Sequence, residues 1–171
     1  MTISVRPATT RDVVAIERLI EPLVQQRILL GKDPVVLYES IQQFVVAEVD
    51  KVVVGCGALH VMWSDLGEIR TVAVSENQRG KGTGNLILDA LEANARRLGL
   101  SRLFCLTFET GFFGARGYEK MGEVGDETGL LVSPEIYAEL LRSHDEGIAE
   151  FLDLARVKPN TLGNTRMLKV L

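Results

Sequence analysis

The segment Arg79-Gly80-Lys81-Gly82-Thr83-Gly84 places alternating glycines and cationic side chains directly before a helix-like stretch. Glycines let the backbone approach a bulky anion, and the N–H groups at a helix start bind phosphate with the help of the helix dipole. Arg79 and Lys81 add formal positive charge. The spacing therefore predicts a cradle for a pyrophosphate group, although a surface loop that only caps a helix has the same composition.

This segment departs from two common phosphate loops. A triphosphate-binding P-loop needs Ser or Thr after Gly-Lys, and Gly82 stands there. The dinucleotide-binding pattern needs a glycine where Asn85 stands. It also needs an Asp or Glu about twenty residues later, at the end of a strand, and no clear strand ends in such a residue here. Nucleoside triphosphates and dinucleotides are therefore disfavoured as ligands of this loop.

The elements on either side must hold this loop in place. Residues 68–74 and 102–108 predict strands, and residues 83–98 predict an amphipathic helix that ends at Gly99. Glu92 is expected on the solvent face of that helix, paired with the cation four residues later. A strand–helix–strand unit of this size predicts a parallel strand pair.

The remaining elements complete an α/β (α+β) domain on a mixed sheet. Valine-rich strands separated at Asp50 predict a hairpin. Further strands are predicted at residues 3–6, 43–49, 51–62 and 167–171, and further helices at residues 13–30, 35–42, 112–116, 134–143 and 146–154. No repeat or linker divides the chain, so we expect residues 1–171 to form a single domain.

Composition restricts the classes of partner. Apolar residues make up 46% of the chain, charged residues 25%, and the net charge is −4. This balance argues against nucleic acid or a membrane surface as a partner, and no apolar run approaches the roughly 18 residues that span a bilayer. The first residues lack the apolar core of a signal peptide, which indicates a cytoplasmic protein. Cys56 and Cys105 lie in apolar, strand-like segments and are expected in the core, and no metal site is expected.

Several segments resemble a known family. Val72-Ala73-Val74 followed by the glycine loop resembles the acyl-CoA motif of the GNAT superfamily of N-acetyltransferases, which reads Gln/Arg-x-x-Gly-x-Gly/Ala, with Arg79, Gly82 and Gly84 at its fixed positions. Residues 112–118 resemble the second motif of that superfamily. Residues 68–74, 106–113 and 159–168 are similar to the acetyltransferase domain of N-acetylglutamate synthases, in particular the short stand-alone actinobacterial type. The likeness covers nearly the whole chain.

The resemblance implies both a fold and a reaction. The fold is a GNAT-like, mostly antiparallel sheet in which a parallel strand pair splays apart. The reaction moves an acetyl group from acetyl-CoA, as co-substrate, to the α-amine of L-glutamate or L-glutamine, the first step of arginine biosynthesis. Residues 79–84 would face the diphosphate, and Val72, Ala73 and Val74 would contact the pantetheine arm. An N–H near Val72 or Ala73 would stabilise the thioester oxygen, and Phe112 or Phe113 is expected beside the cofactor, with Phe113 as the predicted binding residue.

Glu68 is the predicted general base. Because Glu68 shares strand parity with Arg70, Val72 and Val74, its carboxylate is expected on the cofactor side, where it would remove the ammonium proton through a water. A solvated carboxylate paired with Arg70 is the alternative interpretation.

The general acid stays open. Thr107 matches a hydroxyl residue of the synthases and would relay a proton to the departing thiolate, unless it is an ordinary strand residue. Phe113 occupies the position where many GNAT enzymes carry a tyrosine that acts as the general acid. Water is an alternative proton donor, because thiolates leave readily.

An acidic amino acid as acceptor needs cationic partners. The resemblance implies Lys32, at the family's basic position near the substrate, and Arg70 and Arg166 are further predicted acceptor-binding cations, Arg166 in a segment similar to the family's C-terminal motif. Singly, each is more often a surface cation. Two other functions remain open: acetylation of another amine (a peptide N-terminus, a polyamine or a drug), or a non-catalytic acetyl-CoA-binding regulatory module. The oligomeric state is also open, with a homodimer as one option.

Overall fold

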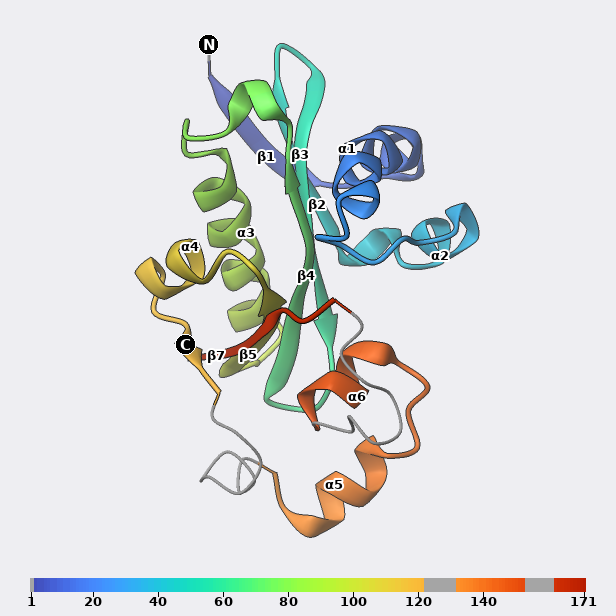
Figure 1. The fold of residues 1–171 in the computed structure, drawn as a ribbon, viewed down its shortest axis with the longest axis vertical. Helices are drawn as coiled ribbons and strands as arrows, with labels where there is room; N and C mark the ends of the chain where they lie inside the picture. Colours follow the sequence, from blue (N-terminus) through green and yellow to red (C-terminus); the bar gives the residue numbers. More distant parts are fainter. Residues whose placement is uncertain (1, 122–131, 153–161) are drawn as a thin grey trace.

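The computed structural model describes residues 2–121, 132–152 and 162–171, and its centre is a seven-stranded sheet in the order β1-β2-β3-β4-β5-β7-β6 (Figure 1). The strands are β1 Ile3–Pro7, β2 Phe44–Val49, β3 Val52–Val61, β4 Leu66–Val74, β5 Arg102–Thr107, β6 Glu119–Lys120 and β7 Thr165–Val170. Among these described strands only β4 and β5 pair in parallel. The mixed, mostly antiparallel sheet and its parallel pair are therefore confirmed, whereas β6 was not predicted.

Helices cover both faces of the sheet. They are α1 Val13–Gln25, α2 Pro34–Glu39, α3 Thr83–Arg97, α4 Thr110–Ala115, α5 Pro134–Leu140 and α6 Glu146–Phe151, with 3-10 turns at Thr10–Asp12, Ile41–Gln43 and Glu76–Gln78. In Figure 1, α3 lies against one face and α1 against the other. Ile87 and Leu91 of α3 pack with Ile69 of β4, and Ile16 of α1 packs with Ala73 of the same strand. The strand β4 is thus buried between two layers of helices.

The first helix ends earlier than predicted, at Gln25. Arg27 adopts a left-handed φ of 58°, the N–H of Ile28 donates to the Leu23 carbonyl at 2.8 Å, and the N–H of Arg27 donates to the Val24 carbonyl at 2.9 Å. These two bonds make a Schellman ending, which usually carries glycine at the left-handed position. Because arginine stands there, the sequence did not reveal the turn. The turn brings Ile28 into the cavities described below.

Two other turns match their sequence signals. Asp50 and Lys51 have φ angles of 50° and 65°, as a type I′ hairpin turn requires, and they join β2 to β3. Gly99 has a φ of 86° and ends α3, with the N–H of Leu100 bonded to the Ala95 carbonyl at 2.9 Å. Both predictions are confirmed.

Side-chain burial confirms one prediction and corrects another. Cys56 and Cys105 are core residues, and burial raises the pKa of the Cys56 thiol to about 12. Glu92 does not face solvent as predicted. Its carboxylate is buried and accepts two bonds from Lys169 Nζ, at 2.8 and 2.9 Å. The strand β7, from the far end of the chain, supplies this cation, and spacing within the helix could not show it.

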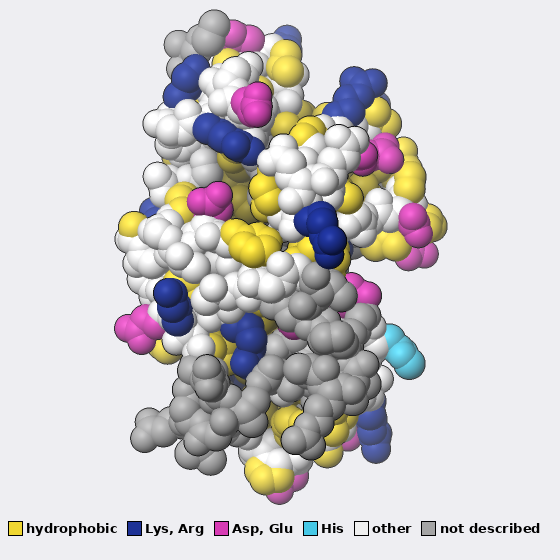
Figure 2. All heavy atoms as spheres, in the orientation of Figure 1, with side chains coloured by type: hydrophobic (Ala, Val, Ile, Leu, Met, Phe, Trp, Pro, Cys, Tyr) yellow, Lys and Arg dark blue, Asp and Glu magenta, His cyan; other side chains and the backbone are white. Residues whose placement is uncertain are grey.

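The surface mixes charges of both signs. On the face seen in Figure 2, Lys and Arg side chains are interspersed with Asp and Glu side chains over the described residues. Within the same described part of the chain, no helix combines the length and apolar character needed to cross a bilayer.

The parallel strands β4 and β5 separate part-way along their length. Their pairing runs from Leu66 with Arg102 to Ile69 with Cys105, and no pairing between them continues into the second half of β4. Beyond that point β5 pairs with β7, while β4 stays on β3. The splayed pair expected from the resemblance is therefore present. The opening lies beside the residues predicted to do the chemistry.

Candidate active site

A groove of about 420 Å³ lies beside the second half of β4 and the start of α3. Its lining includes most of the predicted cofactor-binding residues: Val72, Ala73, Val74, Arg79, Gly80, Gly82, Thr83 and Gly84. The other lining residues are Leu23, Ile28, Gln78, Asn85, Glu109 and Phe112. Lys81 and Phe113 are not among them. The loop and the strand thus form one continuous surface.

The glycine loop has the geometry of an anion cradle. Gly80 and Gly82 have φ angles of 74° and 84°, which glycine adopts without strain. A Cβ at either position would meet no atom within 4 Å, so the loop leaves open space. The N–H groups of Gly82, Thr83 and Gly84 have no acceptor among the described residues, whereas the N–H groups of Arg79 and Lys81 are bonded to carbonyls within the turn. These three unpaired amides at the start of α3 fit a diphosphate.

The aromatic residue beside this cradle is Phe112, and the prediction for Phe113 is corrected. The Phe113 side chain is buried in the core, in edge-on contact with the rings of Phe112 and Tyr118, at centroid distances of 5.2 and 5.1 Å. Phe112 lines the groove and lies so close to the helix start that a Cβ at Gly84 would be 3.3 Å from its Cζ. Gly84 therefore lets the Phe112 ring close one side of the cradle.

A bulge in β4 corrects the predicted strand parity. Cys56 pairs with Ala73 and Ala58 pairs with Arg70, so two residues of β4 stand opposite one residue of β3. Thr71 lies in this bulge with a left-handed φ of 57°, which is rare for a β-branched residue. Because of the extra residue, Val72 packs on the α3 side with Ile69, whereas Glu68 and Arg70 face the opposite side.

The bulge therefore separates two kinds of surface on one strand. The residues before it carry the ionisable side chains, and the residues after it line the large groove. A bulge also leaves one residue out of the hydrogen-bond ladder. This is the part of the backbone, near Val72 or Ala73, where the resemblance predicts an N–H donor for the thioester oxygen.

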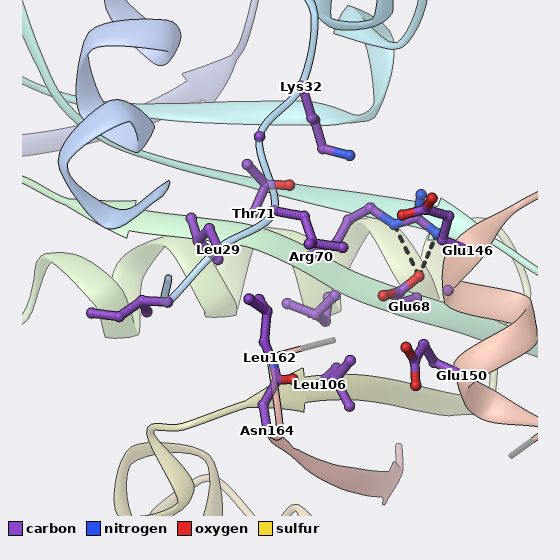
Figure 3. Close-up of a pocket in the computed structure, with 15 residues that line it drawn as sticks. Leu29, Lys32, Glu68, Arg70, Thr71, Leu106, Glu146, Glu150, Leu162 and Asn164 are labelled. Carbon is purple, nitrogen blue, oxygen red and sulfur yellow. Dashed lines mark hydrogen bonds and ion pairs between the residues drawn. The ribbon is translucent and has the colours of Figure 1, made fainter. Parts of the chain in front are cut away.

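A smaller pocket of about 140 Å³ adjoins the groove on the ionisable side of β4. Lys32, Glu68 and Arg70 line it, together with Glu146, Gly147 and Glu150 of α6. Figure 3 shows Lys32 reaching from the loop before α2, and Glu146 and Glu150 reaching from α6, toward the same space. Ile28 lines both cavities, and Thr71 of the pocket precedes Val72 of the groove. The two cavities therefore meet at the bulge.

The centre of the small pocket is an ion-pair cluster on β4. Arg70 Nε donates to Glu68 Oε2 at 2.9 Å, and Arg70 Nη2 bonds the same oxygen (Figure 3). Burial raises the pKa of Glu68, and this effect outweighs the opposing charge of Arg70. A buried carboxyl with a raised pKa, in a pocket, is typical of a general base or acid.

Burial also shifts the pKa of Lys32 in the pocket and of His60 next to the ion-pair cluster. Burial lowers the pKa of Lys32, and the positive charge of Arg70 lowers it further. Burial also lowers the pKa of His60, whose Nε2 lies 3.5 Å from Asp145 Oδ2. Lys32 is the cation of this pocket that carries no ion pair among the described residues.

Thr107 and Arg166 lie next to these cavities, and neither is in their lining. The Thr107 hydroxyl accepts the N–H of Glu109 at 2.8 Å, which leaves its own proton available for donation. Arg166 Nη2 donates to the Phe151 carbonyl at 2.7 Å, at the end of α6. Arg166 thus holds the helix that forms one wall of the small pocket.

Sequence reasoning missed Asp145 and Gly147. They contact the Glu68–Arg70 pair from a segment that lies 75 positions further along the chain. The signal in this region was an Asp before a short amphipathic stretch, which predicts a helix cap and nothing more. The proximity of this cap to β4 is a tertiary feature that residue spacing cannot show.

These cavities define the class of the protein. A phosphate cradle beside a splayed strand pair fits an acyl-CoA, and the adjoining pocket with a buried carboxyl has room for a small acyl acceptor. The class is therefore an acyl-CoA-dependent acyltransferase.

Comparison with known proteins agrees with this class. A model described as "Acetyltransferase (GNAT) family" matches residues 17–122. The amino-acid acetyltransferase of Mycobacterium tuberculosis is 52% identical over 170 residues, which is 98% of this chain and 94% of that protein. The amino-acid acetyltransferase of Azotobacter vinelandii is 40% identical over 119 residues, which is 68% of this chain and 28% of that protein. The chain belongs to the GNAT family of acetyltransferases, for which acetyl-CoA is the co-substrate.

Solved structures give the same result. A crystal structure of Rv2747 from Mycobacterium tuberculosis in complex with CoA matches with a TM-score of 0.87 and 51% identity, covering 98% of this chain and 99% of that chain. The N-acetylglutamate synthase of Neisseria gonorrhoeae, complexed with coenzyme A and N-acetyl-glutamate, matches with a TM-score of 0.77 and 29% identity. That match covers all of this chain and 35% of the synthase chain.

Proposed function

We propose that this chain is an amino-acid N-acetyltransferase that moves the acetyl group of acetyl-CoA to the α-amine of L-glutamate or L-glutamine, the first step of arginine biosynthesis in the cytoplasm. The observation that carries the proposal is the small pocket beside the bulge, which combines a buried carboxyl, a cation and room for a small molecule. The similarity to amino-acid acetyltransferases supports the same acceptor class.

The groove holds the co-substrate. The amides of Gly82, Thr83 and Gly84 bind the diphosphate, and Arg79 adds positive charge at the groove wall. Val72, Ala73 and Val74 contact the pantetheine arm along β4. Acetyl-CoA supplies the acetyl group as a thioester, and this placement brings its carbonyl to the Thr71 bulge. A backbone N–H there stabilises the negative charge that develops on the carbonyl oxygen; one such donor contributes about 3 kcal/mol in known enzymes.

Glu68 removes a proton from the acceptor. The α-ammonium must lose this proton before its nitrogen can attack, and Glu68 takes it through a water. The nitrogen then forms a bond to the acetyl carbon, the carbon–sulfur bond breaks, and the electron pair leaves on sulfur as a thiolate. The nitrogen also gives up its second proton, and Thr107 or water relays a proton to the thiolate. The Phe113 position supplies no such proton, because that side chain is an apolar ring inside the core.

Acceptor recognition falls to Lys32. Its ammonium lies in the small pocket without an ion pair among the described groups, so it can pair with a carboxylate of the acceptor. Arg70 lines the same pocket, but all three of its guanidinium nitrogens are bonded to Glu68 and Asp145. We therefore assign Arg70 to the support of Glu68 rather than to direct capture of the acceptor.

The test is release of free thiol from acetyl-CoA against a panel of amines. Turnover with glutamate or glutamine, and none with polyamines or peptides, is the expected result. Turnover only on amines other than glutamate and glutamine would overturn the acceptor assignment and leave a GNAT enzyme with another acceptor. Binding of acetyl-CoA without turnover on any amine would identify a regulatory module instead.

A further inference from the structure

Asp145 binds a different edge of the Arg70 guanidinium from the edge that Glu68 binds. Arg70 Nη1 donates to Asp145 Oδ2 at 3.0 Å, and Arg70 Nη2 donates to Asp145 Oδ1 at 2.9 Å. Such a two-bond fork fixes the plane of a guanidinium as well as its position. Because Nε and Nη2 also bond Glu68, the orientation of the predicted base depends on a residue from a distant segment.

The Asp145 carboxylate also fixes one wall of the small pocket. Asp145 Oδ1 accepts the N–H of Gly147 at 2.9 Å and the N–H of Ile148 at 3.2 Å, so it also caps α6. The cap lies directly on the ion pair: a Cβ at Gly147 would overlap Glu68 Oε2 and lie 2.8 Å from Arg70 Nη2. Glycine at this position is therefore what allows α6 to approach the pair.

Glu68 and Asp145 share one guanidinium but sit in different surroundings. Burial raises the pKa of Glu68. Burial also acts to raise the pKa of Asp145, yet bonds and charge from Arg70, the charge of His60 and the helix cap hold it at about 2. When environments push two carboxyl groups apart in this way, one serves as a fixed charge and the other exchanges protons.

We propose that Asp145 is a positioning residue for acetyl transfer: it clamps Arg70 so that Glu68 is held in place as the proton acceptor, and it anchors α6 as the pocket wall. This inference rests on the proposed function, in which Glu68 is the base. Asp145 does not touch the acceptor in this scheme; it acts through Arg70 and Glu68.

The charged and titratable groups around Glu68 determine the expected pH effect. They are Arg70 on its own strand, His60 opposite it on β3, Lys32 on the loop before α2, Cys105 on β5, and Asp145, Glu146 and Glu150 on or next to α6. The negative charge of Asp145 opposes ionisation of Glu68. Its removal leaves Arg70 to favour the carboxylate form, so the pKa of Glu68 falls.

Asp145→Asn is the decisive variant, because asparagine still caps a helix but lacks the charge and one acceptor of the fork. The acid limb of the kcat profile is expected to move to lower pH, and plateau kcat to fall about 10- to 100-fold, with acetyl-CoA affinity unchanged. Ser133→Ala is the matched control. Ser133 caps α5 through the N–H of Ile136 and does not contact the ion pair, so its loss should leave the pH profile unchanged.

A double-mutant cycle separates positioning from general support of the fold. If Asp145 acts through Glu68, then D145N lowers kcat in the wild-type background and has no further effect in the E68Q background. Independent losses that multiply would overturn the proposal. An acid limb that stays in place in D145N would also overturn it.

Carboxyl-carbon NMR titration provides a reading that does not depend on turnover. The Glu68 signal, assigned by its absence in E68Q, should titrate at lower pH in D145N than in the wild type. An unchanged midpoint would overturn the role of Asp145 even if the acceptor proves to be another amine. Absence of turnover with any amino acid, with the midpoint shifted as expected, would instead reject the proposed function and keep the link between Asp145 and Glu68.

Gly147→Ala takes the place of D145N if that variant does not fold. Its methyl group presses on the same pair and alters no charge. It is expected to lower kcat in the wild-type background but not in the E68Q background. Equal effects in both backgrounds would contradict the positioning role.

Discussion

The Glu68→Gln substitution is the sharpest perturbation of the proposed chemistry. Glutamine keeps the size of the side chain and one oxygen that can accept from Arg70, while Arg70 retains both bonds to Asp145. The fold around the pocket is therefore expected to persist. General-base catalysis contributes about 10²- to 10⁴-fold, and kcat is expected to fall by a factor in that range.

The pH dependence follows from the buried position of Glu68. The base works only when ionised, so wild-type kcat is lost as pH falls through the pKa of Glu68. Because burial raises that pKa, the loss occurs at higher pH than for an ordinary glutamate. The acid limb of the profile should disappear in E68Q. The assay is thiol release at saturating acetyl-CoA across the acid range, with Glu119→Gln, an exposed carboxyl on β6, as the control.

The same variant is expected to lose activity without losing thermal stability. A carboxyl whose folded-state pKa is raised stabilises the fold at low pH and loses that contribution as pH rises through the folded-state pKa. Ionised Glu68 therefore opposes folding at neutral and alkaline pH, and E68Q should melt no lower than the wild type there. A variant that melts lower would contradict the raised pKa of Glu68, and one that keeps its rate and its acid limb would refute the role of Glu68 as the base.

Three further outcomes are expected. Gly82→Val should weaken acetyl-CoA binding in calorimetry, because a β-branched residue at a φ of 84° costs about 1–2 kcal/mol and displaces the cradle; Gly111→Ala, in open space on α4, is the control that should bind normally. Lys32→Met should raise KM for the amino acid and leave KM for acetyl-CoA unchanged, and equal changes in both would contradict its assignment. Lys169→Met should lower the free energy of unfolding by about 3–5 kcal/mol in denaturant titration, because Glu92 is then buried without its partner; a smaller loss with unaltered m-value would show that Glu92 is not held as described.

Local sequence signals were sufficient for much of the fold. Hydrophobic period and turn residues predicted β2, β3 and α3 to within a few positions, because each element carries its own apolar pattern and ends at a turn such as Asp50 or Gly99. The glycine loop was also informative, since its alternating glycines predicted an open turn before α3, and Gly80 and Gly82 adopt left-handed φ angles there. Its placement beside Val72–Val74 followed from the resemblance rather than from spacing.

Features that depend on tertiary structure could not be predicted. The bulge at Thr71 inverts strand parity, and no glycine or proline marks it. The left-handed turn at Arg27 is hidden for the same reason. Asp145 reaches Arg70 across 75 positions, and only the folded chain brings them together. Phe112 and Phe113 are chemically alike, so their different environments could not be distinguished before the structure was known.

A crystal structure of this chain with acetyl-CoA tests the central claim most directly. The account predicts diphosphate oxygens within hydrogen-bond distance of the amides of Gly82, Thr83 or Gly84, and the thioester beside Val72, facing the pocket that holds Glu68. A diphosphate bound away from residues 79–84, or a thioester that does not approach the bulge in β4, would contradict it.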